Sequence, residues 1–260
     1  MRITLNVSES LEKNAEKYFE KSKKAKSKID GAVETVEKTK KKVEEVKKKE
    51  KKEVEEKKKE ETLKARKKHW YEKFRWFITS DNFMVLGGRD ATSNEIIIKK
   101  HTDDGDLVLH TDMAGSPFFV IKSEGKKISK KALSETADAT CSFSRAWKLG
   151  LLNQSVFYVN PEQISKTPNP GEYLGRGAFM IRGKTKYLDN KINCAVGITD
   201  DGAIMAGPKE AVKKHCKKIV EITQGNEKTS KIAKQIQYKI GGDLDDIIRA
   251  MPTGGVKIKK

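Results

Sequence analysis

The chain changes at His69 from one pattern of polar and apolar positions to another. Up to that residue Lys and Glu predominate, and apolar positions recur at intervals of four, three and seven residues at Ile29, Val33, Val36 and Val43. This is the spacing of a coiled-coil seam. The pattern predicts one charged helix from Leu11 to about Phe77, continuous or kinked at Asp30-Gly31. Because the seam is thin, its packing partner is expected outside this chain.

An aromatic cluster follows the charged stretch. Trp70, Phe74 and Phe77 are spaced i, i+4 and i+7, which places them on one face of the predicted helix. We interpret the cluster mainly as an anchor that buries the end of the helix. Stacking of a ring on an RNA base is the alternative.

Beyond the cluster, short apolar runs alternate with Gly, Asn and Asp turns. The predicted strands are Phe83–Leu86, Glu95–Lys99, Leu107–His110, Phe118–Ile121, Val156–Val159, Ala178–Ile181, two strands from Ile192 onward that are joined by an Asp201-Gly202 turn, and Lys218–Thr223. Helices are predicted over Ser129–Leu149, after Pro208, after Asn226 and after Asp243. The predicted class is α+β: a long charged coiled-coil arm, a mixed and largely antiparallel head, and a small C-terminal α+β extension. The expected domains are 1–76, 77–190 and 191–260.

The charge is strongly positive in both parts of the chain. The net charge is +18, and Arg2–Lys68 accounts for half of it with 24 basic and 15 acidic residues. The head is therefore basic in its own right, and a field of that sign attracts polyanions, above all phosphate backbones. A merely soluble, Lys-rich protein is the alternative.

Cysteine usage and hydropathy place the protein in the cytoplasm. The three cysteines, Cys141, Cys194 and Cys216, show no CxxC spacing, which favours a reducing compartment. No stretch is apolar enough to span a bilayer, and the N-terminus lacks a signal-peptide pattern. No membrane partner is expected.

Catalytic motifs give no support for an enzyme. Gly87-Gly88-Arg89-Asp90 lacks the spacing of a nucleotide-phosphate loop. It is interpreted either as a turn where backbone approaches a ligand and Arg89 supplies a bidentate fork, or as a tight hairpin with an Arg89-Asp90 ion pair. His110-Thr111-Asp112 has no metal-ligand spacing around it, and Cys141 falls within a predicted core helix. We expect no catalytic residue, no metal and no cofactor.

Cations gather among glycines and aromatic residues in the middle of the head. They are Arg145, Lys148, Lys166, Arg176, Arg182, Lys184 and Lys186. Phosphates bind such cations and unstacked bases bind the neighbouring rings, so the mixture suits single-stranded or looped RNA. Scattered surface cations are the alternative.

Short motifs, taken in order over about residues 14–188, make the chain resemble the NFACT family. They are Asn14-Ala15-Glu16-Lys17-Tyr18-Phe19, Trp70-Tyr71-Glu72-Lys73-Phe74-Arg75-Trp76-Phe77-Ile78-Thr79-Ser80, Gly87-Gly88-Arg89-Asp90-Ala91 with Asn94-Glu95, His110-Thr111-Asp112 with Gly115-Ser116, Ser142-Phe143-Ser144-Arg145-Ala146-Trp147, Gln163-Ile164-Ser165-Lys166-Thr167, Gly171-Glu172-Tyr173-Leu174 and Phe179-Met180-Ile181-Arg182-Gly183-Lys184. The set is specific in this order, although each motif is weak alone.

The resemblance implies the C-terminal half of a ribosome quality control factor of the kind to which eukaryotic NEMF belongs. That half consists of a coiled-coil arm and the RNA-binding NFACT-R domain, and the part after Asn190 is similar to the extension of archaeal members. The family binds large ribosomal subunits with stalled peptidyl-tRNA, and full-length members recruit tRNA to add a tail without mRNA. This sequence has no counterpart of the family's NFACT-N and helix-hairpin-helix half, so it is expected to be either a fragment or one product of a split gene, with a separate protein that supplies that half as the partner in the second case.

The sequence thus predicts an RNA-binding module, with tRNA, rRNA and the large ribosomal subunit as partners. The candidate RNA-binding residues are Arg89, Asn94, His110, Arg145, Lys148, Lys166, Arg176, Arg182, Lys184 and Lys186. Asn94 and His110 are expected to offer directional hydrogen bonds and the cations to hold phosphates. The alternative is a coiled-coil adaptor that docks proteins and does not bind RNA directly.

Overall fold

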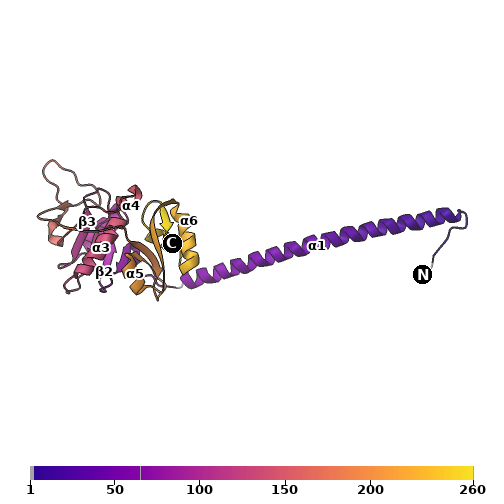
Figure 1. The fold of residues 1–260 in the computed structure, drawn as a ribbon, viewed down its shortest axis with the longest axis horizontal. Coiled ribbons are helices and arrows are strands. Elements are labelled where there is room, and N and C mark those ends of the chain that lie inside the picture. The colour runs from indigo at the N-terminus through magenta and orange to yellow at the C-terminus, as the bar shows by residue number, and fades with distance from the viewer. Residues whose placement is uncertain (1–2, 65, 260) are drawn as a thin grey trace. The chain divides into compact units, whose positions relative to one another are not determined.

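The computed structural model describes residues 3–64 and 66–259, which separate into two compact units, Met1–Thr62 and Leu63–Lys260. The first unit is dominated by one α-helix of 54 residues, α1 (Leu11–Lys64) (Figure 1). The Ser10 hydroxyl caps it by accepting the Lys13 N–H at 3.3 Å. Asp30-Gly31 does not interrupt it, so of the two predicted forms the structure has the continuous one at this point, and the coiled-coil pairing of its seam stays a prediction.

The larger sheet of the second unit has six antiparallel strands in the order β1-β2-β4-β3-β5-β8. Their bounds are Arg75–Ile78 (β1), Met84–Gly87 (β2), Leu107–Thr111 (β3), Phe119–Ile121 (β4), Val156–Val159 (β5) and Lys186–Leu188 (β8). Helix α3 (Lys130–Ser142) packs on β3, β4 and β5. The antiparallel order confirms the α+β class.

A second antiparallel sheet has the order β10-β9-β11-β12. The strands are Cys194–Ile198 (β9), Ile204–Gly207 (β10), Lys218–Glu227 (β11) and Val256–Ile258 (β12), and the helices beside them are α5 (Lys209–His215), α6 (Thr229–Ile240) and α7 (Leu244–Ala250). The smaller elements are η1 (Trp70–Lys73), η2 (Pro161–Gln163), β6 (Ile164–Ser165) and β7 (Met180–Ile181). The last sheet strand, β12, was not predicted.

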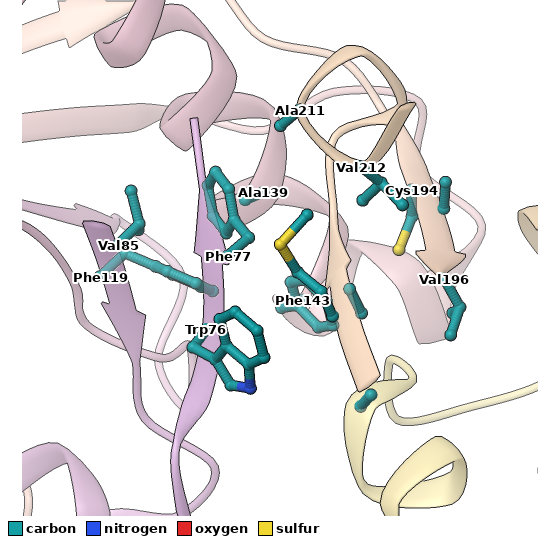
Figure 2. Packing of buried hydrophobic residues seen from close by; sticks show 14 of the residues in the cluster. Trp76, Phe77, Val85, Phe119, Ala139, Phe143, Cys194, Val196, Ala211 and Val212 are labelled. Carbon is teal, nitrogen blue, oxygen red and sulfur yellow. The ribbon is translucent and has the colours of Figure 1, made fainter. Parts of the chain in front are cut away.

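One hydrophobic core joins the two sheets. Phe77 of β1 is fully buried, and it lies with Trp76 between Val85 on one side and Val212 of α5 on the other (Figure 2). A Cβ at Gly207 of β10 would come within 2.7 Å of the Phe77 ring, so that position has room only for glycine. Residues 63–260 therefore form one compact unit, while the predicted division at 76 and 190 stays a prediction.

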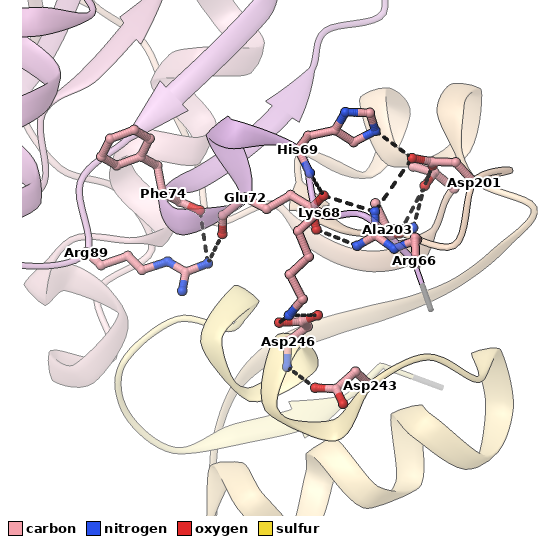
Figure 3. Close-up of polar contacts among 11 residues, drawn as sticks. Arg66, Lys68, His69, Glu72, Phe74, Arg89, Asp201, Ala203, Asp243 and Asp246 are labelled. Carbon is pink, nitrogen blue, oxygen red and sulfur yellow. Dashed lines mark hydrogen bonds and ion pairs between the residues drawn. The ribbon is translucent and has the colours of Figure 1, made fainter. Parts of the chain in front are cut away.

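The prediction that the helix runs to about Phe77 is wrong, because α1 ends at Lys64. Beyond it, Lys68 pairs with Asp246 at 2.7 Å and His69 Nε2 lies 2.9 Å from Asp201 Oδ2 (Figure 3). The aromatic residues are not on one helix face: Trp70 lies in η1 and is 55% exposed, whereas Phe74 and Phe77 are buried, the latter in β1. Strand pairing with β2 and these polar contacts outweigh the local helical spacing.

The predicted strand Glu95–Lys99 is also wrong, because α2 (Ala91–Lys100) is a helix. The three consecutive isoleucines favour a strand, but the Asp90 carboxylate accepts the Ser93 N–H at 2.7 Å and caps a helix. Only Ile97 among the three is fully buried. A helix turns only one of three consecutive residues fully toward the core, which agrees with the burial of Ile97 alone. The Asp90 cap therefore decides that this segment is a helix.

The predicted helix Ser129–Leu149 is two helices, α3 and α4 (Arg145–Leu149). Ser144 ends the continuity, since its hydroxyl accepts the Ala146 N–H at 3.1 Å and donates to the Cys141 carbonyl at 2.7 Å. Such local side-chain bonds compete with helix hydrogen bonds. The break turns α4 away from α3 and lets Arg145 open a new helix.

Candidate functional site

One open cavity of about 480 Å³ lies in the 63–260 unit. The β2–α2 turn, the turn after β3, helix α4 and the 166–178 loop all contribute to its lining. Six of the ten candidate RNA-binding residues line it: Arg89, Asn94, His110, Arg145, Lys148 and Arg176. The fold thus brings together residues that lie up to 87 positions apart in the sequence.

The cavity is strongly cationic. Its basic side chains are Arg75, Arg89, Arg145, Lys148 and Arg176, and Asp90 is the one acidic residue among those described around it. The Asp90 carboxylate already caps α2. Arg145, Lys148 and Arg176, here called the rim cations, are exposed. An uncompensated cluster of this kind binds anions such as phosphate.

Arg75 contributes a buried positive charge that the sequence analysis missed. Its Nη1 donates to the Met251 carbonyl at 3.0 Å, and its guanidinium lies 4.6 Å from the centre of the Phe143 ring. Burial, and then the charge of Arg89, lower the pKa of Arg75 to about 10, so it remains charged at neutral pH. A lone arginine within the apolar run 74–77 was the signal, since arginine is rarely buried without a partner.

Arg89 is held by backbone carbonyls. Its Nη2 donates to the carbonyls of Phe74 at 2.9 Å and Glu72 at 3.2 Å (Figure 3). Its Nε is buried and has no hydrogen-bond partner among the described residues. Burial, and then the charge of Arg249, lower the pKa of Arg89. The side chain is therefore preorganised and retains an unused donor.

The Gly87-Gly88-Arg89-Asp90 turn contradicts the hairpin interpretation of that motif. It connects a strand to a helix, so it is not a hairpin, and Asp90 caps α2 rather than pairing with Arg89. A Cβ at Gly88 would lie 1.7 Å from Asn94 Oδ1. The close approach of Asn94 thus requires glycine at this position, and the approach of a ligand to this turn stays a prediction.

Asn94 and His110 hold the aromatic wall of the cavity. Asn94 Oδ1 accepts the Phe118 N–H at 3.2 Å, and the His110 ring stacks on Phe118 with centroids 4.1 Å apart. His110 Nε2 donates to the Ser116 carbonyl at 3.1 Å. Burial lowers the pKa of His110, which favours the neutral ring. The structure gives both residues internal partners, and their predicted hydrogen bonds to RNA stay predictions.

A clamp between α2 and the 166–178 loop positions Arg176. Glu95 Oε2 accepts the Gly177 N–H at 3.1 Å and lies 3.4 Å from the Lys166 ammonium. Lys166 also donates to the carbonyls of Gly175 and Ala178, both at 3.0 Å. Lys99 first, then the Gly177 N–H and Lys166, lower the pKa of Glu95 to about 2. Lys166, predicted to hold phosphate, is therefore tied to this clamp and lies outside the cavity lining.

The other three candidate cations lie outside the cavity lining as well. Arg182, Lys184 and Lys186, here called the edge cations, are exposed. Arg182 donates to the Thr167 carbonyl at 3.2 Å, and the Lys186 ammonium lies 5.6 Å from the centre of the Tyr158 ring on the neighbouring strand. Their phosphate contacts stay predictions.

The described part of the chain gives little support for other kinds of site. No group of three or more His, Cys, Asp or Glu side chains there is arranged to hold a metal ion. None of the described helices is both long and apolar enough to cross a membrane. Cys141, Cys194 and Cys216 are free thiols, and burial raises the pKa of each to about 12.

Comparison with known proteins gives this geometry a family. Residues 73–183 match the model of the NFACT protein RNA binding domain. The chain is 43% identical to the archaeal Rqc2 homolog aRqcH of Methanocaldococcus jannaschii, over 76% of this chain and 30% of that protein. It is 39% identical to the ribosome quality control complex subunit NEMF of Homo sapiens, over 67% of this chain and 16% of that protein. The Drosophila melanogaster homolog is 36% identical, over 67% and 17%.

The chain spans less than a third of the length of each of these relatives. The matched domain includes the whole cationic cavity apart from Thr253, which the C-terminal segment contributes. The fold, the cavity and the matched relatives agree, and the chain belongs to the NFACT family and carries its RNA-binding domain.

Proposed function

We propose that this chain binds RNA through the cationic cavity. The observation that carries the proposal is the convergence of five basic side chains from β1, the β2–α2 turn, α4 and the 166–178 loop, with a single acidic side chain that is already used as a cap. The rim cations hold phosphates, and Arg89 and Arg75 add charge from the wall. Phosphate contacts of this kind supply most of the affinity of RNA-binding proteins.

The bound RNA belongs to stalled translation complexes. Several relatives carry names of ribosome quality control subunits, which favours the large ribosomal subunit as the place of action. We infer that the chain contacts tRNA or rRNA on large subunits that carry stalled peptidyl-tRNA, in the cytoplasm. Recruitment of tRNA for C-terminal tailing is proposed only for a complex that includes the NFACT-N and helix-hairpin-helix half.

A second function, docking of a protein partner, is favoured by one observation on α1. Its seam residues are exposed by 62% (Ile29), 54% (Val33), 52% (Val36) and 46% (Val43). An apolar stripe on an otherwise charged helix suits a coiled-coil partner. In this proposal α1 docks a protein while the 63–260 unit binds RNA. In the adaptor alternative the chain docks proteins and does not bind RNA directly.

Co-sedimentation with purified large subunits tests the proposal. The full chain is mixed with subunits that carry or lack a P-site tRNA, at two salt concentrations. Binding that requires the tRNA-bearing subunit and weakens steeply with salt is the expected result, because released counterions accompany phosphate contacts. Binding that does not change with salt or with loss of the rim cations contradicts RNA binding and supports the adaptor.

A further inference from the structure

The cavity has two unlike walls. One is formed by the exposed rim cations, and the other by the half-buried Phe179 and Ile181, with Phe118, which is only 4% exposed, packed against Phe179. The Phe118 and Phe179 rings meet edge to face with centroids 5.5 Å apart, and the Lys166 ammonium lies 4.9 Å from the centre of Phe179. A site that only follows a phosphate backbone needs cations alone. Rings beside cations are typical of sites that also stack an unpaired base.

The aromatic wall is fixed in position. Phe118 is held by the Asn94 amide and by the stacked His110 ring, and Phe179 follows the loop that Glu95 and Lys166 clamp to α2. A neutral His110 suits this position, since it adds no charge behind the ring. Preorganised rings lose little entropy when a ligand stacks on them.

The size of the cavity fits one nucleotide. Its volume of about 480 Å³ falls within the range of pockets that enclose a small organic ligand, which is roughly 300–1,000 Å³. The cavity is far too small for a double helix. An RNA strand that lies across the rim can therefore place a single base inside only if that base has left its stack.

The guanidinium groups of the buried Arg75 and the half-buried Arg89 supply hydrogen-bond donors for such a base or its phosphate. Arg75 and Arg89 have carbonyl partners but no carboxylate partner among the described residues, and Arg89 Nε is unused. A buried charge without a counter-ion is costly, and a charged group of this kind in a cleft is a candidate for a functional site. An acidic peptide offers anions but leaves the aromatic wall uncovered.

We propose that the cavity receives one unstacked nucleotide of the bound RNA, with its phosphate on Arg145, Lys148 and Arg176 and its base against Phe179. This inference rests on the proposed function, because it assigns to the same cavity the part of the RNA that enters it. It makes the protein a reader of bulged or unpaired nucleotides rather than of regular duplex.

The test compares three short RNA duplexes of one sequence in fluorescence anisotropy titrations. The first is perfectly paired, the second carries a one-nucleotide bulge, and the third carries the same bulge as an abasic residue. The full chain is expected to bind the bulged RNA at least about fivefold more tightly than the other two, since stacking one base contributes about 1–3 kcal/mol. Equal affinity for the abasic and the complete bulge overturns the inference, because bending alone then explains the preference.

Cavity-filling variants locate the effect. Ala114→Trp and Ala178→Trp fill the cavity from two different segments, whose alanines are both exposed, without changing its charge. Each is expected to abolish the preference for the bulge, so that the three RNAs bind with equal affinity. Ser134→Trp, at an exposed position of α3 outside the cavity, is the matched control and keeps the preference. A preference that persists in both filled variants overturns the proposed site.

The outcomes separate this inference from the proposed function. If no RNA binds, the proposed function itself fails. If all three RNAs bind equally and with a steep salt dependence, RNA binding stands and the nucleotide pocket fails. A poly-glutamate peptide that displaces the bulged RNA at equal charge concentration shows a site for acidic peptide and also overturns the inference.

Discussion

The rim cations and the edge cations are the same kinds of side chain in neighbouring parts of the sequence, yet their surroundings differ. Arg145, Lys148 and Arg176 line a cavity that also holds two less exposed arginines and an aromatic wall. Arg182, Lys184 and Lys186 are exposed outside that lining. The rim cations can bind one anion from several sides, whereas the edge cations can contact an anion only at the open surface.

The comparison shows that position, and not the number of charges, distinguishes a binding site from a basic surface. An exposed cation interacts with a phosphate in a medium of high dielectric and is screened by salt. Cations that approach from several segments share one anion, and low-dielectric walls strengthen the attraction. The following predictions test this difference between the two sets.

Neutralising the rim cations is expected to have the largest effect. The triple variant Arg145→Gln, Lys148→Gln, Arg176→Gln should bind single-stranded RNA about 100-fold more weakly, and the slope of log affinity against log salt should fall by about two. Anisotropy titrations at several salt concentrations measure both quantities. An affinity within threefold of that of the unmodified chain would remove the cavity from the RNA site.

Filling the space beside Gly88 should damage the cavity from within. Gly88→Ala forces its Cβ against the Asn94 amide, which positions Phe118, so the free energy of unfolding should fall by about 2 kcal/mol. Gly175→Ala is the matched control, because a Cβ there has no neighbour within 4 Å. Urea denaturation measures both, and the control should stay within about 0.5 kcal/mol of the unmodified chain.

Loosening the clamp should weaken binding without removing a basic residue. Glu95→Gln keeps the size of the side chain but weakens its attraction for Lys166 and Lys99, so Arg176 and Phe179 lose part of their support. We expect RNA affinity to fall by about threefold to fivefold, a loss of roughly 1 kcal/mol. The substitution also removes a negative charge, and that change alone would strengthen RNA binding. A rise in RNA affinity would therefore show that the clamp does not position the loop.

Neutralising the edge cations should cost little. The triple variant Arg182→Gln, Lys184→Gln, Lys186→Gln removes as many charges as the rim variant but should reduce affinity by less than about threefold at physiological salt, where exposed charges are screened. The same anisotropy titrations provide the measurement. A loss as large as that of the rim variant would show that charge number, not the cavity, determines binding.

The smallest expected effect is that of acidic pH on the free energy of unfolding, through the His110 ring that supports the aromatic wall. Burial holds the pKa of His110 below its ordinary value of 6.5. Just below pH 6.5 the imidazole is therefore protonated in the unfolded chain but still neutral in the folded protein. The stability that depends on neutral His110 is complete above about pH 6.5 and decreases as the pH falls toward the folded-state pKa. His110→Gln should therefore flatten the pH dependence of the unfolding free energy below about pH 6.5.

His101 contributes to the pH dependence of the unfolding free energy in the same direction as His110, so it needs its own control variant. Burial, and then Lys73 and other lysines, lower its pKa as well. The double variant His101→Gln, His110→Gln should be flatter than either single variant in urea denaturation at a series of pH values. A single His110→Gln variant with an unchanged pH profile would contradict the assignment of a buried, neutral ring.

The sequence identified most of the strands and the basic character of the head, because apolar runs between turn residues and charge balance are local properties. It failed where a local pattern has two solutions. The three isoleucines of 96–98 fit a strand as well as a helix, and only the Asp90 cap selects α2. The aromatic spacing at 70–77 fits a helix, but pairing with β2 makes part of it a strand.

The candidate site divides in the same way. By itself the sequence determined that the head is cationic and which ten side chains were candidates, since charge and residue type need no fold. Only the tertiary structure decided that six of them meet in one cavity, that Lys166 serves a clamp, and that Arg75 belongs to the wall. The physical reason is that a binding site depends on distances between segments far apart in the chain, and those distances are set by the packing of the core.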